Sequence, residues 1–127
     1  RIMSTYVKLI EGKGRGVFTD KKISAGDIIE SSPVIEFPEG EWDHVAETVM
    51  SYYCYLWGED LKIGALALGY GSLYNHSYKP NAIYIRKVSE KVIDFVAIRD
   101  IEAGEEITIN YNGVSDSNQP VWFDVVE

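Results

Sequence analysis

The sequence predicts a single, mainly-β domain. Several short segments alternate apolar and polar residues, as half-buried strands do, and glycine-containing turns separate them. Only residues 42–56 repeat their apolar side chains at helical spacing. The chain of 127 residues has the length of one domain, and its 46% of hydrophobic residues is sufficient for a core.

The amino-terminal part contains three predicted strand regions. Residues 5–10 alternate in polarity and predict the first strand. The glycine-dense residues 11–16 predict a turn, after which a second strand begins at Val17. Residues 27–37 are rich in β-branched side chains. Because Pro33 cannot donate a backbone hydrogen bond, we expect two short strands or a sheet edge there.

One long helix is predicted in the middle of the chain. Its apolar residues at helical spacing are Trp42, Val45, Ala46, Val49, Tyr53 and Leu56. Glu41 and Asp43 lie near its start, where negative charge stabilises the helix dipole.

The carboxyl-terminal half contains a predicted hairpin and a last strand. Residues 83–88 and 92–98 form the hairpin, and residues 106–111 form the strand. Residues 22–28 and 100–107 also resemble each other, since each has an Ala-Gly-acid turn that leads into a strand. Two such units are too few for a repeat protein.

The net charge of −8 is concentrated in one segment. Residues 23–61 contain no Lys or Arg and nine acids: Asp27, Glu30, Glu36, Glu39, Glu41, Asp43, Glu47, Glu59 and Asp60. The rest of the chain holds the other 11 of the 20 acids against 12 Lys and Arg. This segment is either a solubilising face or a surface for a basic partner. Direct binding to nucleic acid is disfavoured, because it requires clustered positive charge.

Cysteine content and hydropathy exclude further classes. The single Cys54 excludes an internal disulfide framework and a cysteine zinc site, so we expect no metal. No apolar run reaches the ~20 residues of a membrane span, and no signal peptide opens the chain. We therefore expect an intracellular protein, not secreted, in the cytoplasm or, in a eukaryotic host, the nucleus.

Two motifs are candidates for a binding site. Residues 12–18 read Gly-Lys-Gly-Arg-Gly-Val-Phe, and their glycines expose backbone N–H groups. A phosphate loop would continue with Ser or Thr and a helix, whereas a strand follows here, so a tight turn is the alternative. Asn75-His76-Ser77 lies among turn-forming residues and could be turn chemistry alone. His44 is too distant for a metal pair, and no Gly-x-Ser-x-Gly elbow supports a hydrolase.

In this order and spacing the motifs resemble those of SET-domain protein-lysine methyltransferases. The matching blocks are Gly14-Arg15-Gly16, the Asn-His-Ser-x-x-Pro-Asn of residues 75–81, and the Glu-Glu-Ile-x-x-x-Tyr of residues 105–111. The resemblance implies a β-clip fold of several small sheets with one prominent helix. It also implies that the carboxyl-terminal segment threads through a preceding loop as a pseudoknot. Residues 1–127 would be one SET domain, with its core at 3–111 and a lid at 112–127.

The resemblance implies S-adenosylmethionine on one face of the domain and a substrate lysine that enters a channel from the other. Tyr111 and Tyr55, or Tyr53 in place of Tyr55, would be the catalytic tyrosines. The implied cofactor-binding residues are Lys13, Gly14, Arg15, Gly16, Asn75, His76, Tyr111 and Trp122. The implied channel residues are Tyr53, Tyr70, Tyr74 and Ile109. The aliphatic Ile109 leaves the degree of methylation open.

The sequence departs from the family pattern at two places. Tyr78 replaces a cysteine that many relatives carry, and the cysteine-rich zinc modules that flank many SET domains are absent. The chain therefore resembles the minimal, stand-alone forms of viruses and bacteria. Trp122 and Phe123 are the expected lid, covering adenine or packing on the core. Alternatively, a second subunit could complete the groove in a homodimer.

Three functions follow from the sequence. The first is methylation of lysine in a basic, histone-like protein, which yields S-adenosylhomocysteine. The second is a catalytically weak SET module that binds a basic partner through its acidic face. The third is a structural β-clip domain without a cofactor. The presence of Gly14, Gly16, Asn75, His76 and Tyr111 together favours the first.

Overall fold

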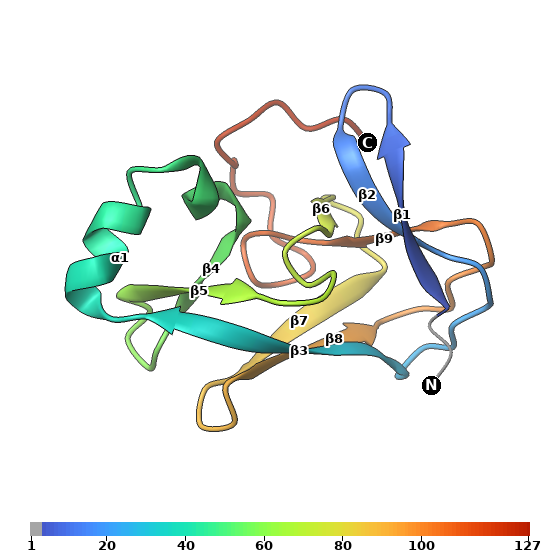
Figure 1. The fold of residues 1–127 in the computed structure, drawn as a ribbon. Coiled ribbons are helices and arrows are strands. Elements are labelled where there is room, and N and C mark those ends of the chain that lie inside the picture. The colour runs from blue at the N-terminus through green and yellow to red at the C-terminus, as the bar shows by residue number, and fades with distance from the viewer. Residues whose placement is uncertain (1–3) are drawn as a thin grey trace.

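Two sheets and two short helices make up the computed structural model, which describes residues 4–127 (Figure 1). The four-stranded sheet has the order β1-β2-β9-β6, and the five-stranded sheet has the order β4-β5-β3-β8-β7. The strands are β1 (Thr5–Ile10), β2 (Gly14–Thr19), β3 (Ile28–Phe37), β4 (Cys54–Trp57), β5 (Ile63–Ala67), β6 (Asn75–His76), β7 (Ala82–Lys87), β8 (Val92–Ala97) and β9 (Glu106–Ile109). The helices are α1 (Glu39–Val45) and the 3₁₀ helix η1 (Val49–Tyr53). The mainly-β prediction is confirmed, while the predicted core boundary at residue 3 lies outside the described residues.

The β1–β2 hairpin is tighter than the sequence predicts. Its antiparallel register runs from Thr5 opposite Thr19 to Ile10 opposite Gly14. The turn therefore comprises only residues 11–13, and the prediction that Gly14 to Gly16 belong to the turn is wrong. These residues are in β2 because the ladder continues up to the turn.

Pro33 lies in one continuous strand, where two short strands or an edge were expected. Residues 28–33 of β3 pair with β8, and residues 34–37 pair with β5 on the other side. Pro33 marks the point where the strand changes partners. A proline is tolerated at this position because each half of the strand has one open edge.

The predicted long helix is broken into two short ones, and its last turn is a strand. The helix α1 ends at Val45, and Thr48 has the extended backbone angles φ −111° and ψ 166° before η1. Tyr55 and Leu56 belong to β4, so the expectation that the helix extends to Leu56 is wrong. No residue of α1 or η1 is buried, and a helix without a buried apolar face gains little from packing.

The hairpin prediction is confirmed, because β7 and β8 pair in register from Ala82 opposite Ala97 to Lys87 opposite Val92. The two similar Ala-Gly-acid segments contact each other. Ile23 and Ile101 form an isolated antiparallel bridge with both backbone hydrogen bonds at 2.8 Å. The backbone N–H of Ala25 donates to the Asp100 carboxylate at 2.9 Å. This pairing joins the segment that leads into β3 to the segment that leads into β9.

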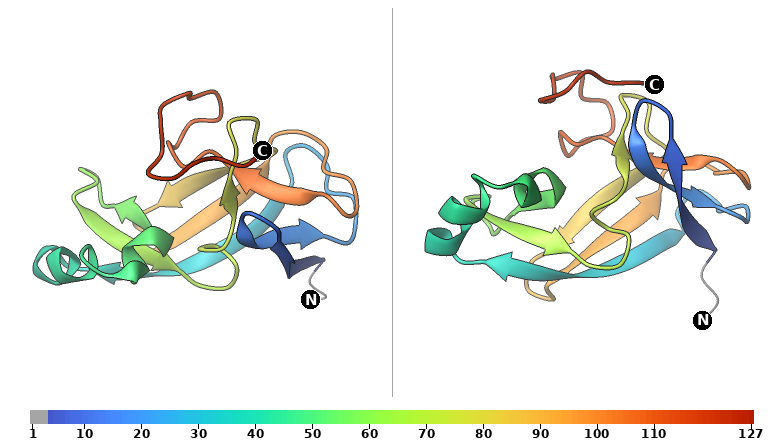
Figure 2. Two further views of the ribbon diagram at one scale, coloured as in Figure 1. Left: turned by 90° about the horizontal axis from the view of Figure 1, so that it is seen from above. Right: turned by 45° about the horizontal axis from the view of Figure 1, so that its top comes forward.

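The five-stranded sheet is curled so that its two edge strands meet (Figure 2). The Tyr55 ring on β4 lies 4.9 Å from the Tyr84 ring on β7, centroid to centroid. The Arg86 Nε–H donates to the Leu56 carbonyl at 2.7 Å. Side chains of the concave face, including the fully buried Phe95, form the core between these edges. The curl therefore creates a seam of aromatic side chains between β4 and β7.

The parallel pair of β6 and β9 joins the two most informative sequence motifs. Asn75 pairs with Thr108, and His76 pairs with Ile109. The predicted last strand ends at Ile109, so Tyr111 follows two residues after it. Asn81 strengthens the junction, since its side-chain amide donates to the Glu106 carbonyl and accepts from the Thr108 N–H. In the described part of the chain, no helix is long and apolar enough to cross a membrane.

Candidate active site

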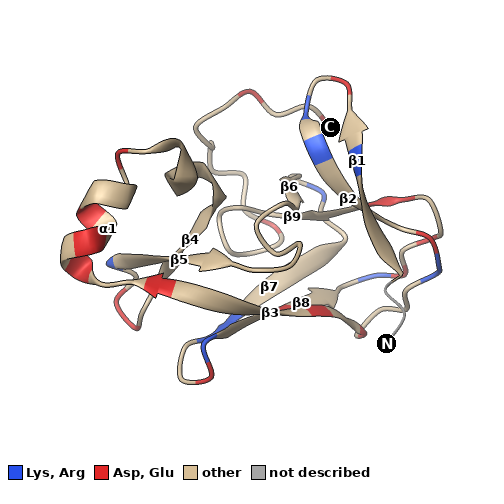
Figure 3. Cartoon of the chain, viewed as in Figure 1, with Lys and Arg blue, Asp and Glu red and all other residues tan. Residues whose placement is uncertain are grey.

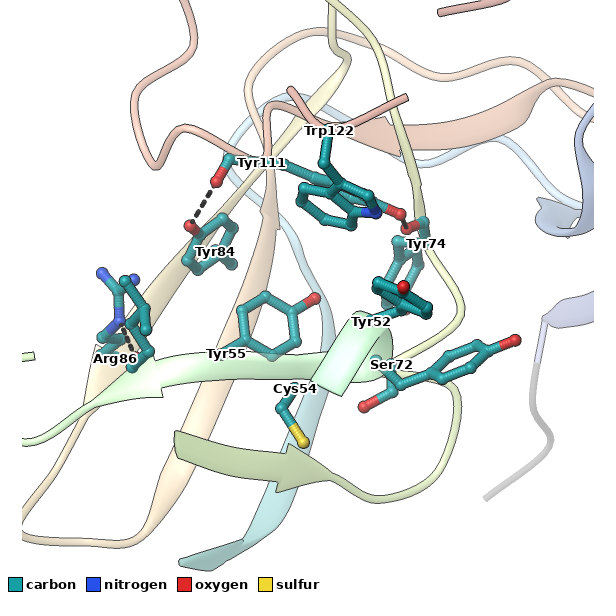
Figure 4. Close-up of a pocket in the computed structure, with 11 residues that line it drawn as sticks. Tyr52, Cys54, Tyr55, Ser72, Tyr74, Tyr84, Arg86, Tyr111 and Trp122 are labelled. Carbon is teal, nitrogen blue, oxygen red and sulfur yellow. Dashed lines mark hydrogen bonds between the residues drawn. The ribbon is translucent and has the colours of Figure 1, made fainter. Parts of the chain in front are cut away.

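Two hollows in the surface share one wall. An aromatic cavity of about 180 Å³ lies over the seam between β4 and β7 (Figure 4). A wider groove of about 520 Å³ adjoins the glycine-rich hairpin of β1 and β2. The residues that line both hollows are Tyr52, Tyr53, Ser72, Tyr111 and Trp122. The two hollows therefore meet at a wall that includes Tyr111.

Tyr111 is held at both its backbone and its phenol. Its N–H donates to Nδ1 of His76 at 2.9 Å, and its hydroxyl donates to the Tyr74 carbonyl at 2.6 Å. Burial is the largest cause that raises the Tyr111 pKa to about 12, and the nearby Glu106 and Tyr53 contribute to the same shift. The phenol is therefore protonated and oriented at neutral pH.

His76 is a buried imidazole with one bonded nitrogen. It is 3% exposed, and Nδ1 accepts the Tyr111 N–H, so the neutral ring carries its proton on Nε2. Within residues 4–127, Nε2 has no hydrogen-bond partner. Burial lowers the His76 pKa, and the carboxylate of Glu127 partly opposes that shift. The ring also borders a smaller hollow of about 80 Å³ beside Lys13 and Asn75.

Two glycines of the β1–β2 hairpin differ in the space around them: a side chain would fit at Gly14 but not at Gly16. Gly14 has a φ of +86°, and no atom lies within 4 Å of the place where a Cβ would stand, so its backbone faces the groove. A Cβ on Gly16 would lie 2.5 Å from Ile10 and 2.7 Å from Glu106. Gly16 therefore allows β2 to approach β9 closely.

Glu106 connects the hairpin to the Asn-His-Ser strand. One of its carboxylate oxygens accepts from Lys13 Nζ at 3.0 Å, and the other accepts from the Asn75 side-chain amide at 2.8 Å. Asn75 also donates to the Arg15 carbonyl at 2.9 Å. The side chains of Lys13 and Glu106 are only 14% and 15% exposed. This network fixes three residues that border the groove.

The aromatic cavity is lined by protonated tyrosines. The Tyr55 hydroxyl donates to the Gly71 carbonyl at 2.7 Å, and the Tyr74 hydroxyl donates to the Glu30 carboxylate at 2.6 Å. Burial raises the pKa of both phenols well above the ordinary value. No Asp or Glu is among the described residues that line this cavity. The cavity therefore lacks a group that would stabilise an ammonium ion by charge.

The carboxyl-terminal tail lies across both hollows. The Trp122 ring stacks on Tyr111 at 5.6 Å and on Tyr52 at 6.2 Å, although it is 60% exposed. The Phe123 ring meets His76 edge-on at 6.2 Å. Glu127 accepts hydrogen bonds from the Ser77 hydroxyl and the Tyr78 N–H. These contacts tie the tail to the loop that carries β6.

Most of the residues that the sequence indicates come together here, but three do not line any of the three hollows. Gly16, expected to bind the cofactor, instead packs against Ile10 and Glu106. Ile109 is fully buried beneath the site, and Tyr70 packs against the core with its N–H bonded to Glu30. Sequence reasoning also missed several residues of the site: Tyr52, Ser72, Tyr84, Arg86 and Glu106. Glu106 had a signal, because it lies inside the matched block Glu-Glu-Ile-x-x-x-Tyr. The residues 4–127 contain no group of three His, Cys, Asp or Glu side chains placed to hold a metal ion.

The fold, together with the meeting of the two hollows at Tyr111, is that of a known class of enzymes. A family model described as the SET domain matches residues 14–112. The chain therefore belongs to the SET-domain family of protein-lysine methyltransferases.

Relatives of known name agree with this assignment. The histone-lysine N-methyltransferase of Schizosaccharomyces pombe, specific for lysine 37 of histone H3, is 39% identical over 102 residues, which are 80% of this chain and 68% of the relative. A Plasmodium falciparum protein solved as a candidate histone methyltransferase superposes with a TM-score of 0.69 at 32% identity, covering 87% of this chain and 95% of that one. CpSET8 from Cryptosporidium gives a TM-score of 0.67 at 26% identity, covering 92% of this chain and 59% of that one.

Proposed function

We propose that this protein transfers a methyl group from S-adenosylmethionine to the side-chain amine of a lysine in a basic, histone-like protein. The observation that carries the proposal is the shared wall at Tyr111, where a groove of about 520 Å³ meets an aromatic cavity of about 180 Å³. Two reactants that enter from opposite sides would meet at this wall. Such alignment is the main requirement of a direct transfer between bound molecules.

The residues of the groove fit the cofactor. His76, in the smaller hollow beside the groove, has a buried Nε2 donor without a partner among residues 4–127, and Gly14 leaves open space above its backbone in the groove. Lys13 and Asn75 would bind the polar groups of its amino-acid part, and Trp122 would cover it as a lid. When bound, the cofactor would supply an electrophilic methyl group. The chain's own contribution would be to hold Tyr111 and its neighbours in place around the point of transfer.

The aromatic cavity suits a neutral amine. Lysine has a reference pKa of about 10.4, so deprotonation near pH 7.4 costs about 4 kcal/mol. Apolar walls disfavour the ammonium form, and no carboxylate lines the described cavity to oppose this effect. Burial also raises the pKa of the Tyr55 and Tyr111 phenols in its wall. The Tyr111 phenol, with a pKa of about 12, would orient the amine and would not act as a base.

The acidic segment supports a basic protein substrate. Four of its acids, Glu39, Glu41, Asp43 and Glu47, lie on or directly after α1 and are exposed (Figure 3). They would attract cationic residues around the target lysine and would disfavour direct binding to nucleic acid. The histone specificity of the S. pombe relative agrees with this substrate class. We place the activity inside the cell, in the cytoplasm or nucleus, and a homodimer stays a prediction.

Labelled-methyl transfer onto a panel of basic proteins, followed by mass spectrometry, tests the proposal. The Tyr111→Phe variant should lose about 100-fold in kcat, because an oriented hydroxyl at the transfer point is removed. Its affinity for S-adenosylhomocysteine, measured by calorimetry, should stay near that of the wild type. Tyr6, which stacks on Phe18 outside both hollows, offers the control Tyr6→Phe.

Different outcomes separate the alternatives. Equal activity of Tyr111→Phe and wild type would remove Tyr111 from the reaction. Binding of S-adenosylhomocysteine without transfer to any basic protein would favour a module that binds a basic partner. No binding of S-adenosylhomocysteine would leave a structural domain.

A further inference from the structure

Arg86 is the one charged residue among the described residues that line the aromatic cavity. It lies on β7 and is held at two points. Its Nε–H donates to the Leu56 carbonyl at 2.7 Å, and its guanidinium carbon lies 5.2 Å from the centre of the Tyr84 ring. These contacts hold the guanidinium at its Nε–H and against the Tyr84 ring.

No carboxylate within residues 4–127 forms an ion pair with Arg86. The neighbouring Lys87 and Lys91 are paired with Asp94 and Glu36, at 2.8 Å and 3.7 Å. An unpaired and partly buried cation is unfavourable, and it is unexpected in a chain with eight more acids than bases. An oriented guanidinium of this kind is suited to bind a planar anionic group through two hydrogen bonds.

The position of Arg86 places this anion beside the target lysine and away from its amine. Arg86 and Tyr84 lie on one side of Tyr55, whereas Tyr74 and Trp122 lie on the other (Figure 4). The Tyr111 hydroxyl is bonded to the Tyr74 carbonyl, which puts the point of transfer on that second side. A group bound at Arg86 would therefore belong to a residue that flanks the lysine.

We propose that Arg86 forms a subsite for an anionic side chain, a carboxylate or a phosphate, within two residues of the target lysine in the substrate. This inference rests on the proposed lysine methylation, because it assigns a further part of the same channel. Recognition would then combine two opposite charges. Basic residues of the substrate would face the acids of α1, and one anionic residue would bind Arg86.

A peptide series tests the subsite. Each peptide has one target lysine. It carries Glu, phosphoserine or Gln at one of four positions, namely the two residues before the lysine and the two residues after it. We expect the wild type to prefer an anionic peptide over its Gln counterpart by about tenfold in kcat/KM, which corresponds to one charge-assisted contact. The comparison of Glu with phosphoserine identifies which anion the subsite takes.

Variants of Arg86 separate recognition from folding. Arg86→Gln can still donate to the Leu56 carbonyl, and it should remove the preference, so that kcat/KM becomes about equal for the anionic and the Gln peptides. Arg86→Lys keeps the charge but not the planar fork, so it should retain part of the preference. Lys87→Gln is the matched control, since it removes the same charge from the next residue, which points to the opposite face of β7. It should keep the wild-type preference.

Two results would overturn the subsite: equal activity of the wild type on all peptides, or an equal loss on all peptides in Arg86→Gln. Peptide binding, measured by fluorescence anisotropy, supplies a readout that does not need turnover. Binding that depends on Arg86 without any methyl transfer would refute the proposed function and support the subsite. Methyl transfer whose rate does not depend on Arg86 would support the proposed function and refute the subsite.

Discussion

The bond from the Tyr111 N–H to His76 Nδ1 makes the position of Tyr111 depend on a neutral imidazole. A proton on Nδ1 would remove the acceptor and leave the backbone donor without its partner. Burial lowers the His76 pKa below its ordinary 6.5, so the folded protein resists this protonation. The same burial therefore makes stability depend on pH.

The direction of that dependence follows from proton binding. Below pH 6.5 the unfolded chain takes up a proton at this histidine before the folded chain does. The stability contributed by neutral His76 is therefore complete above pH 6.5 and is lost as the pH falls toward the lower folded pKa. The Tm should decrease between about pH 7 and pH 5, a range in which histidine is the side chain that titrates.

Thermal unfolding of two histidine variants tests whether His76 causes this decrease in Tm. His76→Asn cannot titrate, and its side-chain oxygen can accept the Tyr111 N–H, so its Tm should fall less on acidification. His44, exposed on α1, offers the control His44→Asn, which should keep the wild-type slope. A wild-type slope in His76→Asn as well would show that other groups cause the pH dependence.

Glu106 is the second residue whose substitution should change the binding of ligand in the groove. Glu106→Gln breaks the ion pair with Lys13 and weakens the bond with Asn75. We expect about a tenfold lower affinity for S-adenosylhomocysteine by calorimetry, because a largely buried charge-assisted contact is lost. Glu105→Gln is the control, since Glu105 instead faces Arg99 at 3.4 Å. Equal affinities in the two variants would mean that the network does not shape the groove.

At the scale of elements, one glycine decides how α1 is attached. A Cβ on Gly64 of β5 would overlap the Trp42 ring, which also stacks on Phe37 at 6.3 Å. Gly64→Ala should therefore displace the ring and lower the free energy of unfolding by about 1–3 kcal/mol, measured by urea denaturation.

For a glycine inside α1, we expect that a change to alanine raises the free energy of unfolding. Nothing lies within 4 Å of a Cβ placed on Gly40, so Gly40→Ala should add about 0.5–1 kcal/mol by favouring the helix. If both variants lose stability alike, the Trp42 contact is not what attaches α1.

Local patterns predicted the regions of β1, β2, β3, β7, β8 and β9, but they missed β4, β5 and β6 and predicted one long helix in place of two short ones. The alternation in residues 83–98 is a local property, and the hairpin of β7 and β8 forms where it was expected. Helical spacing between Trp42 and Leu56 was misleading, because these apolar residues do not share one helical face. Trp42 packs on Gly64, Leu56 lies in a strand, and Val49 is exposed. Which partner an apolar side chain meets is a tertiary property that periodicity does not contain.

At the scale of the whole molecule, the site could be predicted only in part. Gly14, Asn75, His76 and Tyr111 were found because their motifs carry a resemblance to a family. Tyr84 and Arg86 could not be predicted as site residues, because they reach the site only through the curl that brings β7 against β4. Alternating residues of an ordinary strand give no sign of such a curl.

The clustered acidity is a second property of the whole molecule. Neutralising Glu39, Glu41, Asp43 and Glu47 with Gln and Asn should raise the KM for a basic protein substrate. The effect should be several-fold at low salt and smaller at high salt, since the screening length falls from about 30 Å at 0.01 M to about 8 Å at 0.15 M.

Steady-state kinetics at two salt concentrations measures this difference. The control variant neutralises four exposed acids outside the segment: Glu11, Asp20, Glu90 and Glu102. If the two variants have the same KM, only total charge matters, and the segment is solubilising.

The ion pair between Lys13 and Glu106 joins residues that are 93 positions apart. Contacts of such long sequence separation form late in folding, because a large loop must close first. During synthesis, the groove can therefore not assemble before residue 111 and the aromatic ring at 122 have left the ribosome. We therefore expect a nascent chain to bind no S-adenosylhomocysteine until these residues are outside the ribosome.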